Sequence, residues 1–466
     1  MSATGYHSLE ASAPTWPNHG LAPERDNRGA MRRGTIASCL LVLVFVAGVV
    51  GVRPPTAEAG TRGVWSVAAS LITGREEHTA TLLQAGTVLV TGGTDGRNKV
   101  LASAELYNPK TNRWTPAGTM MSTRLDHTAT LLPNGKVLVV GGLDASFPSN
   151  SLASAELYDP TTRVWSPAAS MTIGRARHTA TLLLDGRVLV VGGLSVTLRD
   201  GGMFPNQSVA AEIYDPAIDR WSRTEPMSQY RLDQTATLLH DGRVLVAGGQ
   251  DTASRSAEIY DPKQNRWRTV ASMTNGREGQ TATLLPNGEV LLIGGQGPQT
   301  DPAYPYGVIP IATSDVYAPG ADRWSTVARM SGPRIELTST LLRNGTVLVV
   351  GNAVPGTSRA EVYDPTRNLW SNISDPMDRY HHTATQLPDG RVLVVGGYGI
   401  ESLPSAIIYD PSATAPARRP PTRPLVVIAL LVAALVMLAA VALAIPDVRR
   451  RLRGGRPPGG SEEWIR

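Results

Sequence analysis

Apolar and polar segments alternate in one block that recurs seven times between residues 65 and 411. Each copy holds two short apolar runs joined by a two-residue turn, and then a third run that ends at a proline, as in residues 127–160. Turns such as Asn134-Gly135 and Asp185-Gly186 adopt the positive φ angles of a type I′ turn at low cost. We therefore predict that the first two runs of each copy form a β-hairpin.

Two further strands complete each copy. The second run, residues 137–140 in one copy, is apolar at consecutive positions, as in a strand that is buried on both faces. The third run stops at its proline, because proline cannot donate to the ladder, and a fourth begins at a tryptophan. The tryptophans are Trp65, Trp114, Trp165, Trp221, Trp267, Trp324 and Trp370. Their period of about fifty residues is typical of radial arrays of sheets, so we predict an all-β, seven-bladed β-propeller of four-stranded antiparallel blades.

The seventh copy is incomplete at its end. It has Gly396-Gly397 and Tyr409 but no tryptophan run, whereas the run around Trp65 stands alone before the first copy. We predict that the strand at Trp65 is the fourth strand of the last blade. Pairing of the two ends of the domain would close the ring and remove exposed edges at the join.

A glycine pair, a tyrosine in the third run and a tryptophan in the fourth recur together, for example as Gly141-Gly142, Tyr158 and Trp165. In these features the chain resembles the kelch family of β-propellers, in the form of a bacterial-type, membrane-anchored kelch-repeat protein. The resemblance implies a kelch-type propeller over residues 61–411.

An apolar run near the N-terminus has the features of an export signal. Arg32-Arg33 precede the run and Ala57-Glu58-Ala59 follow it, which indicates a signal peptide or a signal anchor at residues 35–60. Residues 1–34 have no periodicity and are predicted to be a disordered extension, and Met31 is an alternative start. Cys39 lies at the beginning of the apolar run, which argues against a lipidated cysteine.

A second apolar run near the C-terminus is long enough to span a bilayer. Residues 425–445 contain no charge, and we predict a transmembrane helix there, after a Pro-rich linker at residues 412–424. The arginine-rich residues 446–466 are predicted to lie in the cytoplasm and the propeller outside. We thus expect a protein of the cell membrane that crosses it once, or twice if the N-terminal segment is retained.

Charge and cysteine content exclude some classes. The formal net charge of +5 owes much to arginines that flank the predicted membrane segments, so it does not indicate nucleic-acid binding. The only cysteine, Cys39, lies in the predicted signal, and the exported domain would contain no disulfide.

One arginine recurs at the turn into the first strand of every copy: Arg75, Arg124, Arg175, Arg231, Arg277, Arg334 and Arg379. The favoured interpretation is a latch, in which each arginine pairs with the acid of the third strand. The alternative is a ring of guanidinium groups that binds carboxylates or sugar acids. The seventh copy has Ile407 in place of the acid, so Arg379 is predicted to be free for a ligand.

Histidine often follows this arginine by three positions, at His78, His127, His178 and His382. Glutamine or leucine fills the same position in other copies, so we predict no metal site. The residue just before it varies: Glu77, Asp126, Arg177, Asp233, Gly279, Glu336 and His381. These residues are expected to form either a polar channel mouth, where Arg177 and His381 are ligand-binding candidates, or only a solvated edge.

Two long segments between the second and third runs carry aromatic residues. Phe204 lies in one, and Tyr304 and Tyr306 lie in the other. Both segments are expected to overhang the arginine face of the ring. We interpret them as recognition loops or, equally, as self-packed Ω-loops.

Function is therefore predicted to be recognition of a glycan or protein ligand by a membrane-tethered extracytoplasmic propeller. The alternative is a sugar-modifying enzyme, a mutarotase, isomerase or lyase, with its site at the channel mouth. A galactose-oxidase-type copper site requires a cysteine that the exported domain lacks. No catalytic triad or phosphate-binding loop occurs, and we predict no catalytic residues and no cofactor.

Overall fold

The structure is a computed structural model. It describes residues 62–97, 99–145, 150–199, 202–207, 209–250, 254–298, 308–351, 359–373, 379–399 and 403–414. The predicted N-terminal segments, residues 1–34 and 35–60, and the predicted helix and tail, residues 425–445 and 446–466, lie outside these ranges. Within these ranges the structure contains no helix that is long and apolar enough to cross a membrane.

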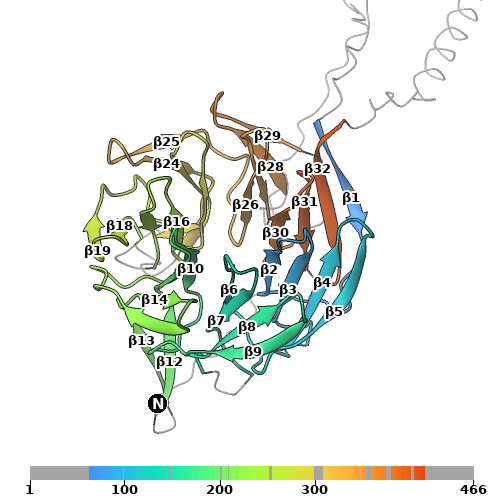
Figure 1. Ribbon diagram of the computed structural model, residues 1–466. Coiled ribbons are helices and arrows are strands. Elements are labelled where there is room, and N and C mark those ends of the chain that lie inside the picture. Colours follow the sequence, from blue (N-terminus) through green and yellow to red (C-terminus); the bar gives the residue numbers. More distant parts are fainter. Residues whose placement is uncertain are drawn as a thin grey trace, which may run out of the picture. The chain divides into compact units, whose positions relative to one another are not determined.

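Seven four-stranded antiparallel sheets make up the fold (Figure 1). The first three blades contain β2 (Thr79–Leu82), β3 (Val88–Thr91), β4 (Ser103–Asn108) and β5 (Arg113–Thr119); β6 (Thr128–Leu131), β7 (Val137–Val140), β8 (Ala155–Asp159) and β9 (Val164–Ala168); and β10 (Thr179–Leu182), β11 (Val188–Val191), β14 (Glu212–Asp215) and β15 (Arg220–Arg223). The next three contain β16 (Thr235–Leu238), β17 (Val244–Ala247), β18 (Ala257–Asp261) and β19 (Arg266–Thr269); β20 (Thr281–Leu284), β21 (Val290–Ile293), β24 (Ser314–Ala318) and β25 (Arg323–Val327); and β26 (Thr338–Leu341), β27 (Val347–Val350), β28 (Ala360–Asp364) and β29 (Leu369–Asn372). The seventh contains β30 (Thr383–Gln386), β31 (Val392–Val395), β32 (Ala406–Thr414) and β1 (Arg62–Ala68).

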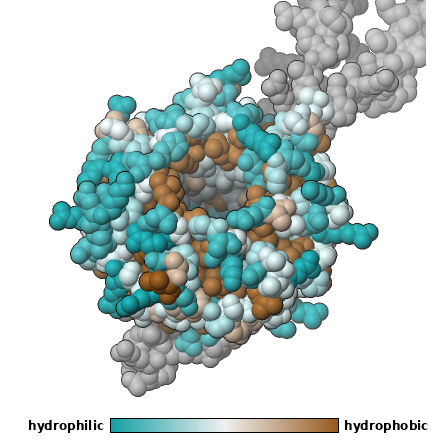
Figure 2. All heavy atoms as spheres, in the orientation of Figure 1, coloured by the Kyte–Doolittle hydropathy of each residue, from teal (hydrophilic) through white to brown (hydrophobic). Residues whose placement is uncertain are grey.

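The first strand of each blade is the innermost one. Strands β2, β6, β10, β16, β20, β26 and β30 contact one another in this order, and β30 contacts β2. They surround a central channel, and Figure 2 shows its opening with apolar residues gathered around it and polar residues over the outer surface. The predicted seven-bladed propeller of antiparallel blades is confirmed.

The core lies between neighbouring blades. In β7, Val137 and Val139 pack with residues of the preceding blade such as Leu89, whereas Leu138 and Val140 pack with residues of the following blade such as Val188. Every residue of this strand is therefore buried. This explains why the second run of each repeat is apolar at consecutive positions, and each such side chain contributes about 1.5–3 kcal/mol of burial free energy.

The ring closes as the sequence predicts. Strand β1 pairs antiparallel with β32, and Trp65 lies opposite Tyr409 in the register. Their rings are 5.0 Å apart, as are the corresponding rings of Tyr107 and Trp114 in the first blade. The N-terminal strand thus supplies the fourth strand of the seventh blade, and β32 continues to Thr414.

The two long segments form β-hairpins in the described residues. Strand β12 (Leu194–Arg199) pairs with β13 (Gly202–Gln207), and Phe204 lies in β13, opposite Thr197. Strand β22 (Gln296–Pro298) pairs with β23 (Val308–Pro310). The Ω-loop alternative is wrong for the first segment, because its backbone hydrogen bonds join its own two strands. Tyr304 and Tyr306 lie outside the described residues.

Candidate binding site at one mouth of the channel

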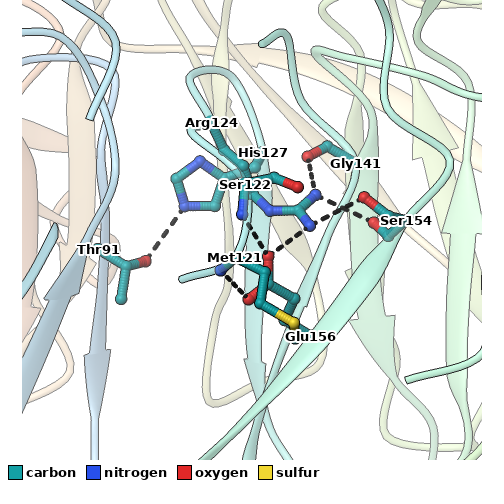
Figure 3. Close-up of polar contacts among 8 residues, drawn as sticks. All are labelled: Thr91, Met121, Ser122, Arg124, His127, Gly141, Ser154 and Glu156. Carbon is teal, nitrogen blue, oxygen red and sulfur yellow. Dashed lines mark hydrogen bonds and ion pairs between the residues drawn. The ribbon is translucent and has the colours of Figure 1, made fainter. Parts of the chain in front are cut away.

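The recurring arginine is a buried latch in six blades. Arg124, in the turn from the first blade into β6, donates through Nη1 to Gly141 O and Ser154 O, and through Nη2 to Glu156 Oε1 at 2.9 Å (Figure 3). The equivalent ion pairs are Arg75–Glu105, Arg175–Glu212, Arg231–Glu258, Arg277–Asp315 and Arg334–Glu361. Glu156 also accepts the backbone N–H groups of Met121 and Ser122. Each latch therefore holds the turn, the glycine pair and the third strand together, which confirms the favoured interpretation.

Burial removes these guanidinium groups from any ligand in the channel. Arg124 is 0% exposed, and desolvation lowers its pKa, although the ion pair with Glu156 opposes this shift. The alternative of an open ring of arginines that binds carboxylates is therefore wrong for these six residues.

Arg379 differs in its partners but not in its burial. It is 1% exposed, and it donates to Gly396 O and to both oxygens of Ser405, the backbone O and Oγ. Within the described residues it has no carboxylate partner, and desolvation lowers its pKa to about 10. Arg379 thus lacks an acid partner in the described part of the chain, as the sequence predicts. Its guanidinium group is nevertheless buried, so it is not available to bind a ligand in the channel.

The histidines link neighbouring blades. His127 Nε2 lies 3.1 Å from Thr79 Oγ1 and 3.2 Å from Thr91 Oγ1, both in the preceding blade. Gly92 packs against this ring with a φ of +63°, and a Cβ there would lie 2.5 Å from Arg124 O, which explains the first glycine of the pair. Burial lowers the pKa of His127 to about 3. Among the described residues no group of three potential metal ligands occurs.

The variable residue just before the histidine position has an unexpected backbone. All seven lie in the left-handed region with φ between 51° and 61°: Glu77, Asp126, Arg177, Asp233, Gly279, Glu336 and His381. We call these seven residues the rim. Left-handed φ angles are uncommon for glutamate and arginine. Glycine, aspartate and histidine adopt them more readily, but they fill only four of the seven positions, so the sequence did not indicate a shared conformation.

Backbone hydrogen bonds connect the rim from blade to blade. Glu77 N donates to His381 O, Asp126 N to Glu77 O, Arg177 N to Asp126 O, and Gly279 N to Asp233 O. Side chains connect two other neighbours, because Arg177 forms an ion pair with Asp233, and His381 Nε2 lies 3.3 Å from Glu336 Oε1. The left-handed turn therefore brings seven residues from seven blades into one circle around the channel mouth.

A cavity of about 330 Å³ lies at one part of this circle. It is lined by Asp126, Arg177, His178, Thr179, Asp233, Gln234, Glu278, Gly279, Gln280, Gln296, Ile335, Glu336 and His381. Gly279 is one of the lining residues, and a Cβ built on it would meet no other atom within 4 Å. The absence of a side chain at this rim position leaves room for a ligand.

Four of the seven rim residues have carboxyl groups. Burial, and then repulsion by Asp126 and Glu76, raise the pKa of Glu77 to about 8, although Arg177 opposes this. Burial likewise raises the pKa values of Asp126 and Asp233. Carboxyl groups with raised pKa values at a concave site are typical of functional sites.

The predicted site residues are therefore only partly brought together. Arg177 and His381 line the same cavity, while Arg379 is buried behind the rim. The sequence analysis did not identify Glu278, whose Oε1 accepts a hydrogen bond from Gln296 Nε2 at 2.8 Å. Its position in the chain varies among the copies without a pattern that would have drawn attention to it.

Comparisons with known proteins agree with the fold. A family model for the Attractin/LZTR1 β-propeller matches residues 61–257. Kelch-like protein 15 of Danio rerio is 36% identical over 90 residues, which are 19% of this chain and 14% of that protein. Kelch-like protein 26 of Danio rerio is 28% identical over 251 residues, or 52% of this chain and 39% of that protein. The chain thus spans less than half the length of these relatives.

Two solved structures share the architecture. A fungal alcohol oxidase of the AA5 family in complex with copper has a TM-score of 0.60 at 18% identity, and the match covers 75% of this chain and 77% of the oxidase. YjhT has a TM-score of 0.51 at 16% identity, and the match covers 66% of this chain and 99% of YjhT. At these identities the likeness shows the fold alone.

The repeats, the closed ring and the latch in each of six blades define a seven-bladed β-propeller of the repeat type. The family match over residues 61–257 and the kelch-like relatives make this chain similar in sequence to kelch-repeat β-propellers.

Proposed function

We propose that the chain is a membrane-tethered, extracytoplasmic recognition module that binds a protein or glycan ligand at the rim. The rim carries this proposal, because seven positions share one backbone conformation and yet hold five kinds of residue. Latches and interblade hydrogen bonds fix the backbone, so the side chains are free to differ. A rigid scaffold that presents varied polar groups around a cavity is typical of a binding site.

Tethering is proposed from the sequence. The uncharged residues 425–445 and the arginines that follow them support a single C-terminal membrane helix with the propeller outside. The export signal at residues 35–60 supports the same orientation. In this arrangement the propeller would meet ligands outside the cell.

The experiment is a binding screen of the propeller, residues 58–414, against arrays of glycans and of extracellular proteins. A ligand found there is then tested with the double variant Arg177→Ala and His381→Ala. The matched control is Arg187→Ala, a partly exposed arginine that pairs with Asp185 in the turn between the first and second strands, at the opposite end of the blade. We expect the rim variant to lose binding and the control to keep it; the reverse result would place the site on the other face.

A sugar-modifying enzyme is the second candidate. Glu336 lies 3.3 Å from His381, and the raised pKa of Glu77 would keep a carboxyl group protonated near neutral pH. Such an acid and base could move protons on a bound sugar. If this is the function, Glu336→Gln should abolish conversion of the sugar while its binding persists, and a recognition module would convert no sugar at all.

A further inference from the structure

The tight turns of the blades lie at the end of the propeller opposite to the rim. In the third blade, β10 begins beside the rim residue Arg177 and ends at the turn of residues 183–187, and the turn of residues 216–219 joins β14 to β15 at the same end. We call the end of the propeller that holds these turns and their equivalents the turn face.

The third blade exposes two large aliphatic side chains on the turn face. Leu184 is 72% exposed and Ile218 is 67% exposed. The other copies have glutamine, proline, histidine or arginine at the first of these positions, and threonine, glutamine, alanine or arginine at the second. Val164, which is 56% exposed, lies at the same end of the second blade, opposite Asp159 in the register. Single exposed apolar residues are normal, whereas three at one end of two adjacent blades favour a contact surface.

An arginine stands beside these residues at the expense of a hydrogen bond. In five other blades an asparagine or aspartate occupies this turn position and accepts the O–H of the buried tyrosine, as Asn112 does from Tyr107 at 2.9 Å. The second blade has Arg163 there, with a φ of +59°, and the O–H of Tyr158 has no partner among the described residues. A residue that is unfavourable for the fold at its position suggests a function for its side chain.

The exposed charge next to the aliphatic residues is positive. Arg163 directly precedes Val164, and Arg220 follows Ile218 by two positions. Both arginines are exposed, and neither forms an ion pair with a described residue. Guanidinium groups bind phosphate well, so this surface combines apolar side chains with groups that suit lipid phosphates.

The chain also continues toward the predicted membrane helix from the turn face. Strand β32 runs past Tyr409 to Thr414, which pairs with Arg62, the first residue of β1. Only residues 415–424 then precede the predicted span at residues 425–445, and a Pro-rich linker of that length reaches about 30 Å when it is extended. The third blade lies across the ring from the seventh, as β14 and β32 show (Figure 1).

We propose that the turn face lies on the surface of the lipid bilayer, with Leu184, Ile218 and Val164 in the interface and Arg163 and Arg220 at the lipid phosphates. The inference rests on the proposed membrane tethering. A tether at the seventh blade alone leaves the propeller free to tilt. A second contact on the far side of the ring holds the turn face against the membrane and keeps the rim open to ligands outside the cell.

The test measures the depth of a fluorescent label in the full-length chain, reconstituted into vesicles of phosphatidylcholine and phosphatidylglycerol that contain spin-labelled lipid. Cys39→Ser removes the native thiol, and Ala217→Cys then carries an NBD label at the exposed tip of the turn. Met121→Cys, at a residue that is 58% exposed in the connection into β6, carries the control label at the rim end. We expect the spin label to quench the Ala217 label about 3-fold more, because interfacial side chains enter about 5–10 Å into the boundary between head groups and acyl chains. Equal quenching of the two labels overturns the inference.

Variants of the exposed aliphatic residues test their part in the contact. The double variant Leu184→Ser and Ile218→Ser should reduce quenching of the Ala217 label to the level of the Met121 label. Ile72→Ser, at a residue that is 61% exposed in the connection into β2, is the matched control and should change nothing. Thermal melting checks that each variant is folded. Undiminished quenching in the double variant contradicts the proposed contact.

Arg163→Asn separates membrane contact from stability. The asparagine should accept the O–H of Tyr158 as its equivalents do in other blades, so the melting temperature should rise. Loss of the cation should at the same time reduce quenching of the Ala217 label in vesicles that contain phosphatidylglycerol. Unchanged quenching in this variant contradicts the role of the arginine.

Flotation of the same vesicles separates this inference from the proposed tethering. If the full-length chain does not float with the vesicles, the tethering and the inference are both wrong. If it floats and the Ala217 and Met121 labels are quenched equally, the tethering stands and the inference alone is wrong.

Discussion

Replacement of Arg124 by methionine tests the latch most directly. The change removes the cation and leaves Glu156, whose side chain is 2% exposed, with only the N–H groups of Met121 and Ser122. Breaking a buried ion pair by removal of one partner costs about 3–5 kcal/mol of unfolding free energy. For a propeller of this size, a loss of about 4 kcal/mol should lower the melting temperature by roughly 5 °C.

Arg379→Met is the matched comparison in the seventh blade. It removes hydrogen bonds to Gly396 O and Ser405, for a cost of about 1–2 kcal/mol, but it leaves no buried acid behind among the described residues. We therefore expect it to lower the melting temperature by only about 2 °C. The assay is thermal and urea unfolding of residues 58–414, which contain every strand of the ring.

A third variant completes the comparison. Ile407→Glu places an acid where the other six blades have one, and Arg379→Met in that background should become as costly as Arg124→Met. Equal losses for Arg124→Met and Arg379→Met in the native background would refute the reasoning, because they would mean that blade seven has a carboxylate partner of its own.

Three further predictions concern closure, pH and topology. Deletion of residues 60–70 removes most of β1, so the ring should open and the melting temperature should fall by many degrees; an unchanged value would contradict closure through Trp65. His127 has a folded pKa of about 3 against an ordinary 6.5, so its contribution to stability is present above pH 6.5 and is lost as the pH falls toward 3. His127→Gln introduces the residue that the fourth copy has at this position, Gln234. This variant should therefore be more stable than the parent by about 3 kcal/mol at pH 4. Urea unfolding at pH 7 and pH 4 measures this, and no gain at pH 4 would show that the histidine is solvated. Protease added to intact cells should remove the propeller but spare a tag placed after Trp464, and loss of that tag would contradict the proposed orientation.

The repeat itself determined most of the fold. Asn134-Gly135 and its counterparts marked the hairpins, but the predicted type I′ turn is wrong: only the glycine has a positive φ, +83° at Gly135, and its N–H donates to Leu132 O, so the turn begins one residue earlier, at Pro133. The missing tryptophan of the seventh copy indicated closure by Trp65. The pairing of arginine with the acid of the third strand was also predictable, because both residues recur at fixed positions in six copies. Such features depend on neighbouring residues or on a fixed repeat, so they can be recognised in the sequence without the tertiary structure.

Only the tertiary structure decided what the channel mouth is. The backbone at Arg177 and Glu336 is left-handed and is tied to neighbouring blades, although neither side chain favours this conformation. The packing of the blades also buries Arg379, which was predicted to bind a ligand and instead donates hydrogen bonds within its own blade. The cavity at Gly279 exists because residues of several blades, far apart in sequence, surround a position that has no side chain. Charge and space at this site are properties of the closed ring, and no single repeat has them.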